Sequence, residues 1–315
     1  MKTLSANSAN ELFAQAVHAV RSGGRKASPR GLDTFELIGV NLVLAEPRRR
    51  LIWLPPTRML NPAFAAAETV WILSGSDGDW IYTYNARLTE FADKGVLRGA
   101  YGPRLRRWDG HVDQLDYVRR VLKDDPDSRR AVIQLYDPGR DHHGNKDVPC
   151  TLGFRFYIRQ GRLEMYTTMR SQDLWLGFCY DIFTFTVLHE LMAGWLGVEL
   201  GRYHHHIDSL HLYAEHLELA GDLPDSVEES GLMPALGTEW SGFDELLRQV
   251  RDGENCAHAG WREIAEVMRS YRVWKGDDRD QAWDLARGAS GPLSRALEQW
   301  YDRLESAAPA TGRSR

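Results

Sequence analysis

With 315 residues, 43% of them hydrophobic, the chain is long enough to bury one large core, or a core with an appended subdomain. A formal net charge of −5 gives no overall basic surface, which argues against a nucleic-acid-binding protein and fits an ordinary enzyme. Three cysteines without a CxxC pair argue against a disulfide framework and a structural zinc site, and they fit a reducing cytoplasm.

The first half of the chain mixes helix and strand patterns. Apolar residues at helical spacing predict helices over residues 10–22, 62–74 and 112–124. Apolar and β-branched runs predict strands over residues 35–44, 50–54 and 131–135. The remaining polar or glycine-containing segments are expected to be loops, notably 98–108 and 138–146. No apolar run is long enough to cross a bilayer, so no membrane partner is expected.

The second half begins with a predicted hairpin of residues 152–158 and 163–168, turning at Gln160-Gly161. A helix that is apolar almost all round is predicted over 182–196, then a strand over 199–206 and a helix over 210–219. Further helices are predicted over 242–250, 261–271, 280–286 and 292–304. We therefore expect an α+β fold, with a catalytic core over residues 1–223, a helical extension packed on it over 224–306 and a disordered tail over 307–315.

Cys150 is the cysteine whose surroundings predict chemistry. It follows Pro149 where a polar loop meets a predicted strand. A free thiol titrates near ~8.5, and neighbouring cations lower its pKa toward a thiolate that can attack a substrate. Several arginines are available to do so here. Cys179 and Cys256 are instead expected to be small buried hydrophobic residues.

Arginines next to predicted strands have the pattern of a phosphate site. Arg129 and Arg130 lie just before one strand, and Arg170 closes another. Each is either a solvated surface charge or part of a bidentate phosphate clamp. Together with Cys150 they suggest a phosphorylated substrate that is attacked by a thiolate.

Two carboxylates and a group of histidines complete the candidates. Glu68 lies on an otherwise apolar helix, so it is either paired with an arginine or acts as a general acid/base through water. Asp181 is either an N-cap or a site residue. The run 204–206 is all histidine, but successive strand residues point to alternate faces, so no metal site is expected. His211 and Tyr213 either grip a sugar hydroxyl or belong to the core.

In combination these motifs resemble the thymidylate synthase family, including its hydroxymethylase members, over about residues 30–216. Pro149-Cys150 is similar to the nucleophile motif of that family, and the segments 170–173, 176–177 and 211–213 are similar to its nucleotide, folate and sugar signatures. The resemblance implies the catalytic residues Cys150, Glu68, Asp181 and Tyr101, the substrate-binding residues Arg30, Arg129, Arg130, Arg170, Ser171, His211 and Tyr213, and the cofactor-binding residues Asp173, Gly177 and Leu88. It also implies 5,10-methylenetetrahydrofolate as co-substrate, a pyrimidine nucleoside monophosphate as substrate, and a homodimer in which Arg129 and Arg130 reach the phosphate of the partner subunit.

Three departures from the methylating members refine this expectation. Asp181 stands where they carry Asn, and a carboxyl group suits the edge of cytosine, whose amine donates and whose N3 accepts. Leu88 stands where they carry a Trp near the folate, and the loss of the indole could admit water to the transferred carbon. The C-terminal third has no counterpart of the short apolar C-terminus that closes over the ligands in that family, so how this site closes is open.

The sequence therefore predicts a hydroxymethylase of a cytidine monophosphate, with dCMP preferred to CMP because Ser171, His211 and Tyr213 keep the pattern of deoxynucleotide enzymes. One alternative is a thymidylate synthase that methylates a uridylate. An alternative of another class is a catalytically idle paralogue that binds nucleotides or RNA.

Overall fold

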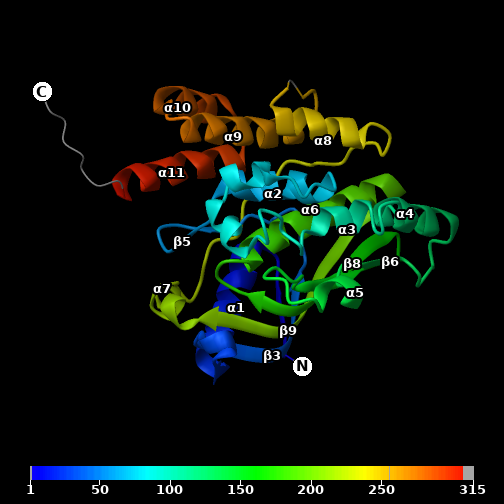
Figure 1. Cartoon of the computed structure of the whole chain (residues 1–315), viewed down its shortest axis with the longest axis horizontal. Coiled ribbons are helices and arrows are strands. Elements are labelled where there is room, and N and C mark those ends of the chain that lie inside the picture. The colour runs from blue at the N-terminus through cyan, green and yellow to red at the C-terminus, as the bar shows by residue number, and fades with distance from the viewer. Residues whose placement is uncertain (1, 255, 308–315) are drawn as a thin grey trace, which may run out of the picture.

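The computed structural model describes residues 2–254 and 256–307, and these form a mixed β-sheet flanked by helices, as the α+β expectation requires (Figure 1). The sheet follows the order β1-β3-β9-β8-β7-β6, and β2 pairs with β3 beside this path. Its strands are β1 (Lys2–Ala6), β2 (Arg25–Ala27), β3 (Thr34–Leu44), β6 (Val132–Gln134), β7 (Thr151–Arg159), β8 (Arg162–Asp173) and β9 (Glu199–Tyr213).

The parallel pairing of β8 with β9 decides where the site lies. Neighbours in this register are Ser171 with Ser209 and Asp173 with His211. Because parallel strands end at the same edge of a sheet, two motifs far apart in the sequence meet at one place. The predicted hairpin is confirmed as β7 and β8, which turn through Gln160 and Gly161.

Long helices cover the sheet and supply the core. Helix α1 (Ala9–Gly23) packs on β1 and β3, and α6 (Phe178–Leu196) packs on β8 and β9. The apolar circumference of α6 is explained by its neighbours, since α2 (Pro62–Leu73) and α4 (Gln114–Asp124) pack against it as well. Every residue of α2 is buried except Glu68.

A layer of C-terminal helices covers the far side of α2 (Figure 1). It consists of α8 (Phe243–Asp252), α9 (Ala259–Lys275), α10 (Arg279–Gly288) and α11 (Pro292–Ala307). Helices α8, α9 and α11 each contact α2. The helix that carries Glu68 is thus held between the core and this layer. Residues 308–315 of the predicted tail lie outside the described part of the chain.

Several local predictions were wrong. The helix expected over 210–219 does not form, because β9 continues to Tyr213 between β3 and β8 and gains hydrogen bonds on both sides. Only η4 (Ala214–His216) and α7 (Leu217–Gly221) follow it. The strand expected over 50–54 is reduced to β4 (Trp53–Leu54), paired with β5 (Arg58–Met59). The edge strands β1 and β2 were missed.

The two segments expected to be loops contain short helices. Residues 98–108 include α3 (Tyr101–Arg106), and residues 138–146 begin with α5 (Pro138–Asp141). Single 3-10 turns, too short for a periodic signal, complete the connections: η1 (Pro29–Gly31), η2 (Asp79–Thr83) and η3 (Ala86–Phe91). Among the described helices, none combines the length and the apolar character needed to cross a bilayer.

Candidate active site

Cys150 lies at the entrance to β7 and is fixed in place by Arg170 on the neighbouring strand. Nε and Nη2 of Arg170 donate to the carbonyl oxygens of Pro149 and Val148, each at 2.9 Å. The backbone N–H of Arg170 also donates to the carbonyl oxygen of Cys150 at 2.9 Å. One side chain therefore orients the loop before the thiol, and its exposed guanidinium keeps further donors for a ligand.

The arginines lower the pKa of Cys150 as expected, but the net shift of this pKa is upward. Burial raises the pKa of the thiol, while the charges of Arg170 and Arg30 lower it by less. Asp181 and Asp147 add to the increase. The thiol is thus mainly protonated near neutral pH, and a thiolate requires either more positive charge or proton transfer on substrate binding.

Tyr101 approaches Cys150 from α3. Its hydroxyl oxygen accepts hydrogen bonds from the backbone N–H and the Oγ1 of Thr151, at 3.3 and 3.1 Å. Burial keeps the pKa of Tyr101 well above its usual range, so the phenol is neutral. It can therefore donate a proton in a hydrogen bond to a ligand beside the thiol.

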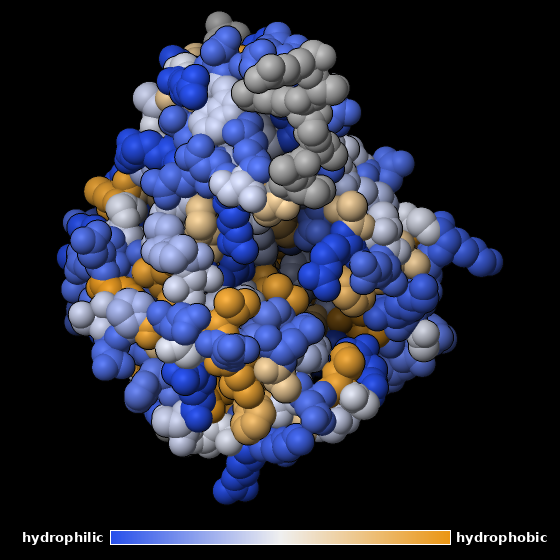
Figure 2. Space-filling model, turned by 90° about the vertical axis from the view of Figure 1, so that its left-hand side faces the viewer, coloured by the Kyte–Doolittle hydropathy of each residue, from blue (hydrophilic) through white to orange (hydrophobic). Residues whose placement is uncertain are grey.

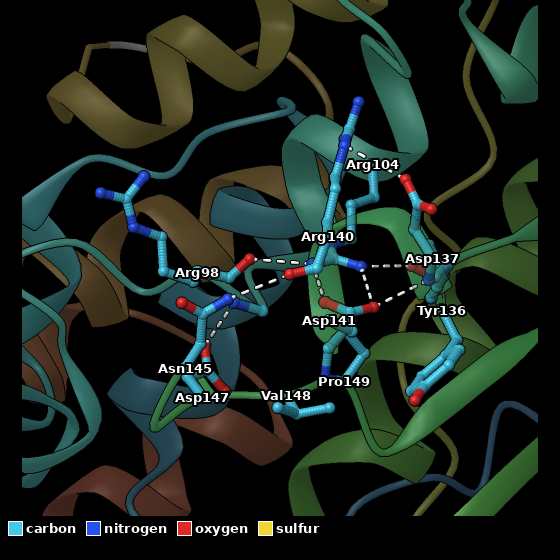
Figure 3. Close-up of polar contacts among 12 residues, drawn as sticks. Arg98, Arg104, Tyr136, Asp137, Arg140, Asp141, Asn145, Asp147, Val148 and Pro149 are labelled. Carbon is cyan, nitrogen blue, oxygen red and sulfur yellow. Dashed lines mark hydrogen bonds and ion pairs between the residues drawn. The ribbon is translucent and has the colours of Figure 1, made fainter. Parts of the chain in front are cut away.

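A buried ion pair holds α3 against the loop that precedes Cys150 (Figure 3). Nη1 and Nη2 of Arg104 donate to the two carboxylate oxygens of Asp141, at 2.7 and 2.5 Å, and both residues are almost fully buried. The same guanidinium donates to the carbonyl oxygens of Arg98 and Leu135. A second link joins the backbone N–H of Gly99 to Oδ2 of Asp147 at 2.8 Å. The segments on either side of the thiol loop are thereby tied together.

Asp181 lies in the first turn of α6 and does not cap it, because the N-cap position is occupied by Gly177. Its Oδ2 accepts a hydrogen bond from Nε2 of Gln172 at 2.8 Å. Burial raises the pKa of Asp181 to about 7, with a smaller increase from the charge of Asp173 and an opposing decrease from the Gln172 hydrogen bond. The carboxyl group is therefore about half protonated near neutral pH. Gln172 was not among the predicted site residues.

Glu68 faces Asp181 from α2. Burial raises the pKa of Glu68 to about 8, and the charge of Asp181 contributes to the increase. The hydrogen bonds of the described residues include none to its half-buried carboxyl group, and no arginine pairs with it. A carboxylic acid that is neutral at pH 7 and titrates just above it suits proton transfer.

The sugar and phosphate candidates lie at the end of β9. The rings of His211 and Tyr213 are nearly perpendicular, with centroids 5.4 Å apart. Arg30, in η1, is close enough to lower the pKa of Tyr213, although burial makes the net shift upward. The charge of Arg30 lowers the pKa of Cys150 as well, so Arg30 lies near both groups. Ser171 lies one residue from Arg170 on β8 and is half-buried.

The remaining predicted residues have more mixed surroundings. Oδ1 of Asp173 accepts from the backbone N–H groups of Trp175 and Leu176 at 2.8 and 3.0 Å, which shapes the turn into α6. A Cβ at Gly177 would lie 3.0 Å from Nε2 of Gln172 and 3.6 Å from Oδ2 of Asp181, so glycine leaves room for that pair. Leu88, in η3, is half-buried against the core.

Arg129 and Arg130 are not brought to the thiol of their own chain. Both are exposed in the turn before β6. The histidine run alternates as expected: His205 is buried against Met169 and Tyr203, while His204 pairs with Glu164 at 3.0 Å on the opposite face. The surface view turned toward α7 and α11 shows a hollow below the C-terminal helices, with apolar residues along its rim (Figure 2).

Comparison with known proteins identifies the family. Residues 11–228 match the family model described as "Thymidylate synthase". The "Deoxyuridylate hydroxymethyltransferase" of Bacillus phage SP01 is 38% identical over 229 residues, which cover 68% of this chain and 60% of that relative. The protein of the same name from Pseudomonas phage M6 is 31% identical over 340 residues, covering 98% of this chain and 95% of that relative, so its similarity extends through the C-terminal helices. The chain therefore belongs to the thymidylate synthase family of folate-dependent one-carbon transferases.

Proposed function

We propose that the chain is a pyrimidine nucleoside monophosphate 5-hydroxymethylase that takes its one-carbon unit from 5,10-methylenetetrahydrofolate. The observation that carries the proposal is the grouping of one thiol, Cys150, with two carboxyl groups of raised pKa, Glu68 and Asp181. The names of the two phage relatives support hydroxymethyl transfer rather than methylation.

The chemistry begins at the thiol. The thiolate of Cys150 adds to C6 of the base, which makes C5 a nucleophile toward the one-carbon unit of the folate. After C5 has lost its proton and tetrahydrofolate has left, hydroxide adds to the transferred carbon, and release of Cys150 gives the 5-hydroxymethyl nucleotide. In balance, the nucleotide, methylenetetrahydrofolate and water give the product and tetrahydrofolate. Glu68 orders water and moves the protons, and Tyr101 donates beside the thiol.

Binding residues follow from their positions. Arg170 and Arg30 hold the phosphate, while Ser171, His211 and Tyr213 hold the phosphate and sugar. The second oxygen of Asp173, the backbone of Gly177 and the apolar side chain of Leu88 fit the pterin side of the folate. We propose that Arg129 and Arg130 reach the phosphate of a partner subunit in a homodimer, because they are exposed and far from the thiol of their own chain.

Asp181 is the residue that chooses the base, and it favours a cytidylate. A protonated carboxyl group donates to N3 of cytosine, and its carbonyl oxygen accepts from the 4-amino group. With a pKa of about 7, the protonated form is available at neutral pH. Among cytidylates we keep dCMP as the first substrate and CMP as the second.

A second candidate substrate is deoxyuridylate, which the names of both phage relatives favour. A protonated carboxyl group resembles an amide, since it can donate to O4 of uracil while accepting from N3–H. Asp181 is thus compatible with either base. The protonated oxygen donates to N3 in a cytidylate and to O4 in a uridylate.

The test is mass spectrometry of the products from dCMP, CMP, dUMP and UMP with methylenetetrahydrofolate, together with tritium release from C5-labelled nucleotides. A product heavier by one hydroxymethyl group from dCMP supports the proposal. A methylated product from dUMP would indicate a thymidylate synthase. No tritium release from any of the four nucleotides would indicate a binding protein.

A further inference from the structure

Gln172 is a buried amide beside Asp181 whose role the proposed mechanism leaves unassigned. Its side chain is 2% exposed. Nε2 donates to Oδ2 of Asp181 at 2.8 Å and, more weakly, to the carbonyl oxygen of Asp173 at 3.3 Å. Among the described residues Oε1 of Gln172 has no hydrogen-bond partner.

Packing does not explain an amide at this position. A buried polar atom without a partner costs on the order of 1–3 kcal/mol, which an apolar side chain of the same length would avoid. The chain instead has a glycine where the amide needs room. A Cβ at Gly177 would lie only 3.0 Å from Nε2 of Gln172. The strong contact that the amide makes is the one to Asp181.

This contact distinguishes the two oxygens of Asp181 and gives each a separate role toward the base. Oδ2 is occupied by the N–H of Gln172, and the hydrogen bonds of the described residues include none to Oδ1. A proton on the carboxyl group is also directed to Oδ1, because Oδ2 already accepts a hydrogen bond. Oδ1 is therefore the oxygen that carries the proton toward the base, while Oδ2 is the acceptor and keeps a second lone pair for the base.

We propose that Gln172 is a positioning and specificity-determining residue that holds Asp181 with Oδ1 as the protonated oxygen and Oδ2 as the acceptor toward the pyrimidine edge. The inference rests on the proposed function, because there Asp181 chooses the base. A carboxyl group that rotates freely can exchange its donor and acceptor oxygens and serve both pyrimidines, whereas a held group keeps one arrangement. Loss of the amide should therefore relax the choice between cytidylate and uridylate.

Other groups that face Asp181 also titrate, so the test must separate their effects. They are Asp173 on β8, Tyr203 on β9, Glu68 on α2, Tyr101 on α3, Cys150 before β7 and Cys179 on α6. All of these side chains remain in place in the variants at Gln172.

The experiment compares Gln172→Met with Gln172→Glu. In Gln172→Met the donor is lost, and the ratio of kcat/KM for dCMP to that for dUMP should fall about tenfold, because a buried acceptor left without its donor costs on the order of 1–3 kcal/mol. In Gln172→Glu the new carboxyl group donates to Asp181 only when protonated, so the wild-type ratio should return at acidic pH and disappear as the pH rises. The matched control is Gln249→Met, because Gln249 on α8 also donates to a carboxylate, Oε1 of Glu245 at 3.0 Å.

A direct readout separates this inference from the proposed function. The pKa of Asp181 is followed by carbon-13 NMR of labelled aspartate, with its signal assigned by Asp181→Asn, and it should rise in Gln172→Met. An unchanged pKa together with a wild-type base ratio overturns the inference even in a fully active enzyme. If the wild type turns over neither nucleotide, the proposed function fails and base selection fails with it, while the NMR result still decides whether Gln172 holds Asp181. If Gln172→Met does not fold, a pH-independent base ratio in Gln172→Glu overturns the inference.

Discussion

At the scale of single residues, burial is the dominant influence on the site. It raises the pKa of Cys150, Glu68 and Asp181 together, although cations lie close to the thiol. Such a site holds its protons until a charged ligand changes the local field. A phosphate alone would raise these pKa values further, so the thiolate must come from proton transfer within the site or from added positive charge, such as the arginines that we propose a partner subunit lends.

Replacing Cys150 with Ala should abolish turnover and leave nucleotide binding largely intact, because the thiol forms the bond to C6 while other groups hold the phosphate and sugar. Tritium release from C5 of the nucleotide measures the step, and calorimetry measures binding. Cys256→Ala serves as the control, since Cys256 is buried in the C-terminal layer. Exchange that persisted in Cys150→Ala would contradict the mechanism.

Replacing Asp181 with Asn should lower kcat/KM for cytidylate roughly ten- to a hundredfold, since a mismatched buried polar group costs on the order of 1–3 kcal/mol and ~1.4 kcal/mol is one decade. The amide serves a uracil edge, so C5 exchange on uridylate should appear or increase. The ratio of kcat/KM for the two nucleotides is the measurement. An unchanged ratio would remove Asp181 from base selection.

Replacing Glu68 with Gln should make stability less dependent on pH. The native pKa of Glu68, about 8, lies above its ordinary value of 4.5, so the folded protein binds this proton more tightly than the unfolded chain. The contribution of Glu68 to stability is therefore fully present below pH 4.5 and is lost as the pH rises toward 8, by at most ~1.4 kcal/mol per pH unit. Between pH 4.5 and 8, thermal unfolding should show a smaller decline in Tm for Glu68→Gln than for the wild type. The exposed control Glu218→Gln should show the same decline as the wild type.

At the scale of elements, the site is a junction of segments that are each short or irregular. The thiol loop, α3 and α5 have little regular structure of their own, and the Arg104–Asp141 pair connects them (Figure 3). Strands β8 and β9 supply the rigid edge beneath. The arrangement places reactive groups on loops while buried polar contacts restrict their motion.

Replacing Arg104 with Met should destabilise the protein by roughly 3–5 kcal/mol, the usual effect of leaving one member of a buried ion pair uncompensated. The double variant Arg104→Met/Asp141→Leu removes both charges and should recover most of that loss. Denaturant unfolding tests both. The rate of Cys150 alkylation should change in the double variant, because the loop loses its link to α3. A double variant as unstable as the single one would argue against this pairing as the source of the effect.

At the scale of the whole molecule, α2 lies between the sheet-based core and the C-terminal helices (Figure 1). Arg272 of α9 donates to the hydroxyl of Tyr84 at 2.7 Å, and Tyr84 also stacks with Tyr271. The family model ends at residue 228, yet the M6 relative aligns along nearly all of the chain. We propose that the C-terminal helices are an integral support for α2 and therefore for Glu68.

A shared site in a homodimer predicts complementation between inactive chains. Each variant should be nearly inactive alone. Cys150→Ala lacks the nucleophile, and Arg129→Ala/Arg130→Ala lacks the phosphate contacts that each subunit lends to its partner. After exchange of subunits, mixed dimers should recover part of the activity, since one of their two sites is intact. Subunit exchange is verified by native mass spectrometry, and verified exchange without recovery would show that the site is not shared.

The sequence determined the elements with strong periodicity and the motifs that act locally. The spacing of apolar residues located α1, α2, α4, α6 and the C-terminal helices, and turn chemistry located the β7–β8 hairpin. Local context predicted two site residues. Cys150 follows Pro149 at a loop-to-strand junction, where a nucleophile can be exposed, and Glu68 is a lone carboxylate on an apolar helix.

Only the tertiary structure decided what those residues experience. A one-dimensional pattern cannot show that β9 runs on to Tyr213, because the partners that stabilise it, β3 and β8, lie far away in the chain. It also could not find Gln172: residues three apart on a strand point to opposite faces, so alternation with buried Met169 predicts an exposed side chain at position 172, yet Gln172 is buried too. The pKa of Cys150 depends on the sum of burial and distant charges, and that sum exists only once the chain has folded.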